Sequence, residues 1–355
     1  MNYRRILTYL KKHWQRVALI TGALLVCFSA LSVVVLTVSH RRAIEGERPG
    51  HTGEAERASP VARTYTDLYA VLIDNHADSR PPSGLEAAEI VYEAPVEGGI
   101  TRFLAVYERG NEVAEIGPVR SARAYYLDWI AELGPSLFLH VGGSPESLAR
   151  IRNDATLRES DADGIGWAGV AYWRDKKRFM PHNAYTSSAL VEDLFGERGG
   201  DERRMDAWLM AAAPSESELG AGRGAAIPFH GTAYRPEWRY ERAENAYVRH
   251  HRGTPELTRD GKRLLAQNVA VMFTDVSTID AVGRKRIRTT GEGEGIVFRN
   301  GEMLLATWRN EAYGAPVLFF DEAGNEIAFT QGNVWIEVVP KELTVETVLP
   351  TTPGQ

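Results

Sequence analysis

Two glutamates and an arginine stand close together in the stretch EAPVEGGITRF, residues 93–103. Glu93 and Glu97 are four residues apart, a Gly-Gly pair follows, and Arg102 interrupts an apolar run. Glutamate can act as a general acid or base, and arginine can bind a carboxylate or phosphate through two parallel hydrogen bonds. The stretch therefore predicts either a binding site for an anionic ligand or an acid–base site.

The Gly-Gly pair lies between two β-rich runs and predicts a hairpin with a two-residue turn, since glycine accepts a positive φ. Glu93 then pairs with Leu104, and Pro95 pairs with Arg102. Because side chains alternate between the two faces of a strand, Glu93, Glu97 and Arg102 are expected on one polar face, opposite a core face. An ordinary solvated face with weak ion pairs is the plain alternative.

The spacing of the two glutamates limits the chemistry. At a rise of about 3.3 Å per residue they lie about 13 Å apart along the strand. Retaining and inverting glycosidases both place their two carboxyl groups closer together than that. A glycosidase built on Glu93 and Glu97 alone is disfavoured, whereas a mechanism with a single glutamate is not.

A helix is expected over residues 121–133, from the apolar spacing of Tyr125, Tyr126 and the residues that follow them. Arg120 and Arg123 then stand at its start, where free N–H groups attract anions. Two arginines in that place indicate a carboxylate or phosphate partner, either a ligand or the hairpin acids. The tyrosines could stack on a sugar or a peptide.

Polar residues also follow strand ends in three further stretches. LHVGGSPES (139–147) ends a strand before two glycines and a helix capped by serine, which is similar to an anion-binding turn. LIDNH (72–76) and MPHN (180–183) supply further histidines, and a lone histidine is more often structural than catalytic. With the hairpin and helix residues, the candidate ligand-binding set comprises Asp74, Asn75, His76, Glu93, Glu97, Arg102, Arg120, Ser121, Arg123, Tyr125, Tyr126, His140, Gly142, Gly143, Ser144, His182 and Asn183.

Several function classes find no support. HExxH, GxSxG and Walker motifs are absent. Metal binding by Asp74, His76, His140 and His182 has no local ligand spacing in its favour, so neither a metal nor a cofactor is expected. The net charge of −6 and a pI of about 5.9 argue against a nucleic-acid partner.

The N-terminus predicts a membrane anchor. Residues 1–16 are basic without an acid, and residues 17–39 carry no charge. A run of about 20 apolar residues spans a bilayer, and the basic leader favours a cytoplasmic N-terminus. We expect an uncleaved, single-pass signal anchor in the cell membrane, with the bulk of the chain extracytoplasmic. Cleavage as a signal peptide and lipidation at Cys27, which Val26 disfavours, are the alternatives.

The fold class expected for the remaining chain is α+β. A flexible tether (40–64) precedes an N-terminal mixed α/β domain (65–195) with a hairpin-containing sheet. A Gly-, Ala- and charge-rich linker (196–226), with a helix over about 202–212, leads to a mostly antiparallel β-domain (227–345). Residues 346–355 are expected to be a tail.

The chain resembles the YerB-like family of bacterial envelope proteins. The resemblance is carried by VLIDNH, RPPSGL, IVYEAPVEGGITRF, IGPVRSARAYYLDW, LHVGGSPES and MPHNAYTS, and later by AYVRHHRGTPEL and GNVWIEVVP. It covers roughly residues 65–342. It implies an N-terminal and a C-terminal domain of unknown function in a secreted or lipid-anchored protein, although this chain lacks a typical lipidation sequence. It supplies no reaction.

Two hypotheses follow. The first is an envelope protein that binds an anionic or amphoteric ligand, such as a cell-wall fragment, or an envelope protein, in a charged pocket of the N-terminal domain. The alternative is a lyase or hydrolase acting on the cell wall, with Glu93, Glu97, His140 and His182 as catalytic candidates. Both hypotheses require Glu93, His140 and Arg123 to converge on one cleft.

Overall fold

The computed structural model describes residues 59–198 and 203–350. The predicted leader and membrane anchor lie outside the described residues, as does most of the predicted tether. Among the residues that the structure describes, no helix is long and apolar enough to cross a membrane. The described chain is mainly sheet with short helices, which agrees with the expected α+β class.

A sheet of ten strands forms the centre, in the order β20-β19-β18-β15-β22-β3-β4-β2-β5-β6. The strands are β2 (Leu68–Asp74), β3 (Ile90–Pro95), β4 (Thr101–Glu108), β5 (Leu137–His140), β6 (Asp161–Asp163), β15 (Asn268–Thr274), β18 (Gly291–Arg299), β19 (Glu302–Asn310), β20 (Leu318–Phe320) and β22 (Val334–Pro340). β22 pairs in parallel with both β15 and β3. One sheet thus contains strands from both sides of the predicted linker.

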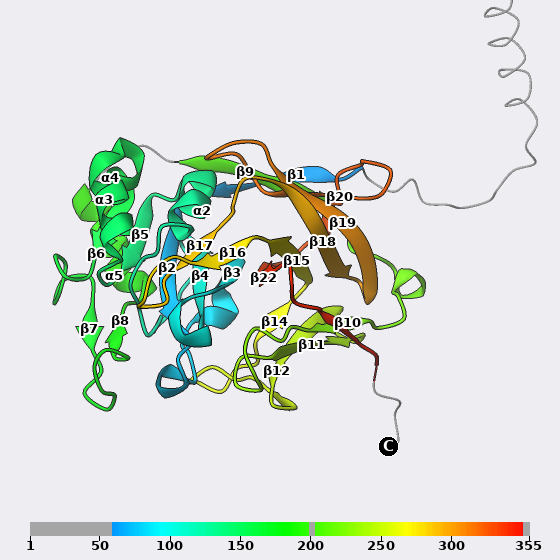
Figure 1. The fold of residues 1–355 in the computed structure, drawn as a ribbon, viewed down its shortest axis with the longest axis horizontal. Coiled ribbons are helices and arrows are strands. Elements are labelled where there is room, and N and C mark those ends of the chain that lie inside the picture. Colours follow the sequence, from blue (N-terminus) through cyan, green and yellow to red (C-terminus); the bar gives the residue numbers. More distant parts are fainter. Residues whose placement is uncertain (1–58, 199–202, 351–355) are drawn as a thin grey trace, which may run out of the picture. The chain divides into compact units, whose positions relative to one another are not determined.

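Two smaller sheets and two hairpins complete the strands. Figure 1 shows β10, β11 and β12 in a layer apart from β18 and β19. This layer contains β10 (Gly224–Ala226), β11 (Pro236–Glu241), β12 (Ala246–His251), β13 (Thr254–Pro255), β14 (Leu265–Ala266) and β23 (Glu346–Val348). The three-stranded sheet contains β1 (Val61–Thr66), β9 (Arg204–Ala211) and β21 (Phe329–Thr330), and the hairpins are β7 (Trp173–Arg174) with β8 (Ala184–Tyr185) and β16 (Val276–Thr278) with β17 (Lys285–Ile287).

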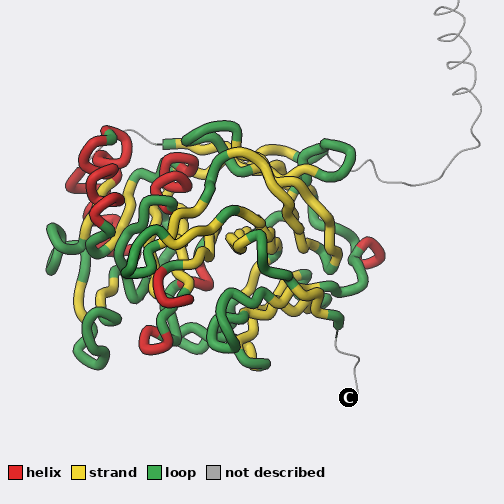
Figure 2. Tube along the Cα trace, in the orientation of Figure 1, coloured by secondary structure: helices red, strands yellow, loops and turns green. Residues whose placement is uncertain are grey.

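The α-helices gather near β5 and β6, at one end of the described unit (Figure 1), and the short red segments elsewhere in Figure 2 are 3₁₀ turns. The α-helices are α2 (Tyr126–Leu133), α3 (Pro145–Asn153), α4 (Ala155–Ser160) and α5 (Ser188–Arg198), with short 3₁₀ turns η1 (Ala77–Ser79), η2 (Leu85–Ala87), η3 (Glu97–Gly99) and η4 (Glu216–Glu218). The predicted cap of α3 is confirmed, because the side chain of Ser144 accepts a hydrogen bond from the backbone N–H of Ser147.

Three expected boundaries are wrong. β9 occupies the middle of the segment expected to be a linker with a helix, because it pairs with β1. β1 itself begins at Val61, inside the segment expected to be a flexible tether. The helix expected from residue 121 begins only at Tyr126, since Arg120 and Ala122 instead bond to the backbone beside β2 and β5.

The predicted register of the hairpin is also wrong. Glu93 pairs with Phe103, one residue away from the expected Leu104. The turn has three residues rather than two, since the N–H of Val96 donates to the carbonyl of Ile100 at 2.7 Å. A shift of one residue moves a side chain to the other face of the sheet. Glu93 therefore lies on the face opposite to Arg102.

Gly99, at the end of this turn, explains why the loop takes a glycine pair. Its φ is +72°, in the left-handed region. A Cβ at Gly99 would also lie 2.5 Å from the ring of His230. The turn is thus fitted against the C-terminal half, and this non-local contact is not visible in the local sequence.

The sheet is buried on both faces at its central strands β2, β3, β4, β15 and β22. One face carries Tyr92, Leu104 and Trp129 of α2, and the other carries Phe103 and Trp335. The face expected to be polar is therefore a second core. Charged residues on the central strands are enclosed and must find partners inside the protein.

Glu132 is one such enclosed acid. It accepts hydrogen bonds from the hydroxyl of Tyr92 at 3.2 Å and from the N–H of Val317 at 2.9 Å. No cation pairs with it among the described residues, and burial raises its pKa from 4.5 to about 8. Glu132 is consequently protonated at neutral pH and links α2 to the segment before β20.

This raised pKa predicts a loss of stability with rising pH. Between about pH 4.5 and 8 the unfolded chain releases the Glu132 proton while the folded chain holds it, so unfolding becomes more favourable. We expect the free energy of unfolding to fall across this range by about 3 kcal/mol more in the wild type than in Glu132→Gln. Urea denaturation at pH 5 and pH 8 measures both. Parallel pH dependences in the two proteins would contradict the assignment.

Candidate functional site

Charged residues meet where β2 ends, and we call Asp74, His76, Asp78, Arg102, Arg120 and His182 the Asp74 cluster. Arg120 Nε lies 3.1 Å from Asp74 Oδ2, and His182 Nδ1 lies 2.6 Å from the same oxygen. Arg102 is opposite Asp74 in the β2–β4 ladder. All but Asp78 belong to the predicted candidate set, and they come from four separate stretches of the sequence.

The backbone places Arg120 between two strands. Its N–H donates to Leu72 O at 2.8 Å, beside β2, and its carbonyl accepts from Val141 N at 3.1 Å, just after β5. His182 lies near the end of the loop joining β7 to β8, where its N–H donates to Phe179 O at 2.9 Å. The cluster thus lies at the carboxyl ends of the parallel strands β2 and β5.

Asp74 is ionised despite being only 2% exposed. Burial acts to raise its pKa, but the charges of Arg102 and Arg120 and the hydrogen bond with His182 hold that pKa below its usual value. The backbone N–H of His76 also donates to Asp74 Oδ1 at 3.1 Å. The carboxylate therefore acts as a fixed negative charge that orients its neighbours.

His182 is oriented by this carboxylate. Because ionised Asp74 can only accept, the proton of a neutral His182 lies on Nδ1, and Nε2 keeps a lone pair. The rings of His182 and His76 are stacked at 4.6 Å between centroids. Their side chains are 14% and 35% exposed, so solutes can reach both.

Arg120 has hydrogen-bond donors that no residue of the described chain uses. Its terminal guanidinium nitrogens form no hydrogen bond or ion pair with any residue of the described chain, and the side chain is 23% exposed. Arg102 is buried behind it and donates to the carbonyl of Ser121. A guanidinium with free donors at a partly open position is suited to a carboxylate or a phosphate.

Glu97 and Arg123 form a pair of their own beside the cluster. Arg123 donates to both oxygens of Glu97, at 2.7 and 2.8 Å. Burial acts to raise the pKa of Glu97, but the bonds from Arg123 lower it overall. Arg123 donates further to the carbonyl of Ala122 at 2.9 Å. Both side chains are thus engaged with each other, which is the internal pairing left open by the sequence.

His140 belongs to a separate set of contacts. It is fully buried, with Nε2 2.7 Å from Asp161 Oδ1 and Nδ1 2.8 Å from the carbonyl of Gly142. The N–H of Gly142 donates to Asp163 Oδ1 at 2.8 Å. A carboxylate of the protein itself thus occupies the turn that was expected to hold an anion, and a Cβ at Gly143 would lie 2.6 Å from the hydroxyl of Ser147.

The remaining candidates have structural roles. Tyr125 and Tyr126 are buried, and their hydroxyls donate to the carbonyls of Pro95 and Arg102, so neither ring offers a stacking surface. The side-chain amide of Asn183 donates to backbone carbonyls of the β7–β8 loop. Ser121 donates to the carbonyl of Val141.

Glu93 lies on the other face of the sheet, in a buried set that we call the Glu93 network: Asn75, Glu93, Thr101, Arg249, Glu256 and Glu337. Glu93 Oε2 is 2.7 Å from Arg249, and Glu93 Oε1 accepts from Thr101 and Asn75. Glu93 is 1% exposed. The single cleft expected from Glu93, His140 and Arg123 is therefore not formed, and both functional hypotheses are wrong in the form that the sequence predicted.

Arg249 holds this network together. It also contacts Glu256, and its guanidinium lies 5.4 Å from the ring of Phe103 and 5.6 Å from that of Trp335. Glu337 is opposite Glu93 in the β22–β3 ladder. Burial, then the charge of Glu93, raises the pKa of Glu337 well above its ordinary value, so that Glu337 carries a proton.

Sequence reasoning missed Asp78, Arg249, Glu256 and Glu337. Asp78 follows His76 by two residues, a spacing that could have marked a shared site. Glu337 is the one acid in the apolar strand VWIEVVP, and Arg249 follows AYV in a strand. A charge inside an apolar strand is the available signal for a buried ion pair.

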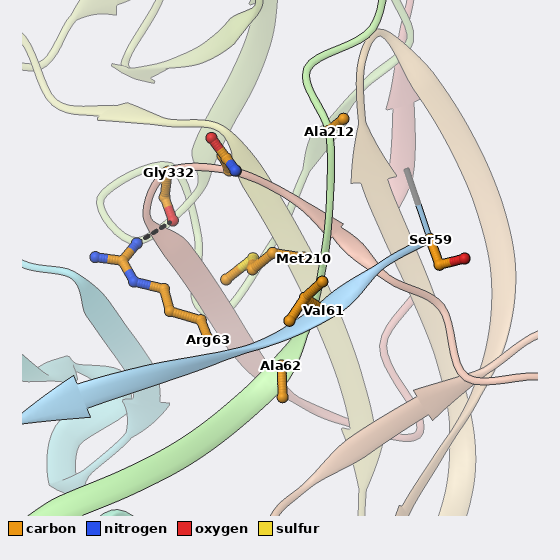
Figure 3. A pocket seen from close by; sticks show the side chains of 8 residues that line it. Ser59, Val61, Ala62, Arg63, Met210, Ala212 and Gly332 are labelled. Atoms are coloured by element: carbon orange, nitrogen blue, oxygen red, sulfur yellow. Dashed lines mark hydrogen bonds between the residues drawn. The ribbon is translucent and has the colours of Figure 1, made fainter. Parts of the chain in front are cut away.

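A cavity of about 540 Å³ lies elsewhere, beside β1 and β9. Figure 3 shows Val61 and Arg63 of β1 facing Met210, with Arg63 reaching the carbonyl of Gly332. Arg63 is also paired with Glu89 at 2.8 Å. Because its one charged group is engaged, the cavity lacks the uncommitted donors of the Asp74 cluster, and we place the candidate site at the cluster.

Comparison with known proteins defines the class. Residues 51–201 match the family described as "Protein of unknown function (DUF3048) N-terminal domain", and residues 225–336 match its C-terminal domain. The chain belongs to this two-domain family.

One curated relative is "Putative lipoprotein YerB" of Bacillus subtilis (strain 168), which is 29% identical over 275 residues, 76% of this chain and 80% of the relative. The crystal structure of YerB from Bacillus subtilis matches with a TM-score of 0.69 at 25% identity, over 84% of this chain and 97% of that one. The resemblance expected from the sequence motifs is confirmed.

The Glu93 network predicts that replacing two different arginines will lower the free energy of unfolding by very different amounts. Arg249→Met leaves Glu93 and Glu256 as buried carboxylates without a partner, and we expect a loss of about 3–5 kcal/mol in the free energy of unfolding. Arg239→Met, on the adjacent strand, removes an arginine that is 35% exposed and pairs with Glu237, and we expect a loss of about 1 kcal/mol at most. Urea denaturation compares them, and equal losses would contradict a buried network.

Proposed function

We propose that this chain is a membrane-anchored extracytoplasmic protein that binds an anionic, cell-wall-related ligand at the Asp74 cluster. The uncharged segment 17–39 supports a single-pass anchor, and the relative YerB carries the name "Putative lipoprotein". The same segment would make the cell membrane a partner. The site is narrower than the pocket expected from the sequence, since it excludes Glu93 and His140.

The free guanidinium end of Arg120 is the observation that carries the proposal. Among the buried and half-buried groups here, the charges of Arg102, Arg120 and Arg123 face those of Asp74 and Glu97, which leaves one positive charge in excess. Asp78 is 75% exposed, and solvent weakens its field. A ligand carboxylate or phosphate would supply the missing charge and accept both terminal nitrogens of Arg120.

The β7–β8 loop supports an organic ligand rather than a bare ion. Phe179 and Met180, three and two residues before His182, are 90% and 69% exposed. Exposed apolar side chains beside convergent polar groups are common where proteins bind organic molecules. Lys176 and Lys177 on the same loop are also exposed and add positive charge.

An acid–base enzyme remains the second candidate, and the Asp74–His182 contact is the observation that favours it. A carboxylate that holds Nδ1 of a histidine leaves Nε2 able to take a proton, as in hydrolases that use a histidine base. Arg120 could then stabilise developing negative charge. Glu93 and Glu97 are engaged with Arg249 and Arg123, so His182 replaces them as the preferred base.

Binding to soluble peptidoglycan fragments tests the proposal. Calorimetry with the full-length protein should show saturable binding that weakens about tenfold or more in Arg120→Gln, because the ligand anion loses a bidentate partner. Arg152→Gln, which changes an exposed arginine of α3 outside the cluster, should bind like the wild type. Equal affinity in all three proteins, or no binding by the folded wild type, would overturn the proposal.

The enzyme alternative is separated by a zymogram on purified cell wall. Clearing by the wild type that disappears in His182→Gln would establish turnover at this site. Binding without any released fragment would leave the binding function and remove the enzyme. Clearing that persists in His182→Gln would show that the His182 base is not required.

A further inference from the structure

We infer that His76, Asp78 and His182 form a site for one divalent transition-metal ion, with Zn²⁺ as the best-matched chemistry. Their potential ligand atoms all lie within 4.8 Å of one another. Two imidazoles and one carboxylate are ligands that zinc accepts, and a set of three protein ligands leaves a position open for water or for an anion. The inference deepens the proposed function, since it concerns the same cluster.

The distance between His76 and Asp78 already suits a shared ion. His76 Nδ1 lies 3.6 Å from Asp78 Oδ2. Bonds of about 2.0–2.1 Å at a tetrahedral angle separate two zinc ligands by about 3.3 Å. The N–H of Asp78 now donates to His76 Nδ1 at 3.2 Å, which shows that this nitrogen carries a lone pair. The ion would take the place of that N–H.

Asp74 prepares His182 as the third ligand. Metal-bound histidines commonly donate their other ring N–H to a carboxylate, which fixes the tautomer and the ring orientation. The contact of 2.6 Å between His182 Nδ1 and the carboxylate of Asp74 is this arrangement, and it directs the lone pair to Nε2. Asp74 is itself held by Arg120, so the carboxylate that orients His182 also has a fixed position.

Closing the site requires the histidine stack to open. The rings of His76 and His182 are inclined by only 17°, and two nearly parallel planes cannot both contain one metal ion. His76 is the partner that can turn, because its side chain is 35% exposed and it precedes the short turn η1. A movement of about 1–2 Å brings separations below 4.8 Å to the spacing of zinc ligands.

A bound cation would add to the positive charge of the cluster and so strengthen its attraction for a ligand anion. It would offset the carboxylate of Asp78, and its open position would face the ligand anion that Arg120 also contacts. An anion held between a metal ion and a guanidinium is a common way to bind phosphate or carboxylate groups.

Zinc titration of the full-length protein, purified in detergent and stripped with a chelator, tests the inference without any wall fragment. We expect one equivalent of Zn²⁺ in calorimetry, with affinity at least tenfold weaker in His182→Gln and in Asp78→Asn. His230→Gln removes an exposed histidine outside the cluster and should bind like the wild type. Substituting Co²⁺ should give visible absorption that the double variant His76→Gln/His182→Gln lacks.

The double variant also sets the baseline for histidines elsewhere in the chain. If the wild type binds no more Zn²⁺ than this variant, while both keep the same circular dichroism and melting temperature, the inference is overturned. Arg120→Gln distinguishes the two proposals: it should bind Zn²⁺ normally while losing wall fragments. Normal binding of fragments by a protein that takes up no Zn²⁺ would overturn the metal site and leave the proposed function standing.

Discussion

Burying an arginine among carboxylates costs free energy that only close partners offset, and Arg249 meets this condition at the centre of the protein. It is 2% exposed and lies between Glu93 and Glu256, against the rings of Phe103 and Trp335. Glu93 comes from the N-terminal half of the chain and Arg249 from the C-terminal half. The pairing therefore fixes how the two halves meet, and a mismatched register would leave charges without partners.

The central sheet is also built from strands of both halves of the chain. β22 lies between β15 and β3, so the edge of β3 is covered by a strand near the end of the described chain. An uncovered β3 would present unpaired backbone groups at an apolar edge. The two family domains are thus each continuous in sequence but share one sheet, whereas the residues of the Asp74 cluster all come from the N-terminal domain.

The sequence identified the local features well. The strand ending at Asp74, the serine cap of α3 and the polar stretches around Arg120 and His182 follow from residue type and short-range spacing. The predictions that failed depend on contacts between residues far apart in the sequence. The register of β3 and β4 depends on a third turn residue, and Gly99 fits against His230, which no local pattern records. The expectation that Glu93 shares a polar face with Arg102 fails because nothing near them in sequence indicates a second core layer.

The one-residue difference in the register of β3 and β4 gives Glu93 and Arg102 separate roles. With the register as it is, Glu93 turns toward Arg249 and holds the core, while Arg102 turns toward Asp74 and supports the site. Had both lain on one face, they would have neutralised each other. Arg102 instead helps to keep Asp74 ionised from the buried side of the cluster. The terminal nitrogens of Arg120 therefore stay without a partner among the described residues. Because the charges behind the site are fixed by buried partners, a ligand reaching Arg120 and His182 would meet groups already oriented, and less of its binding free energy would be lost in ordering them.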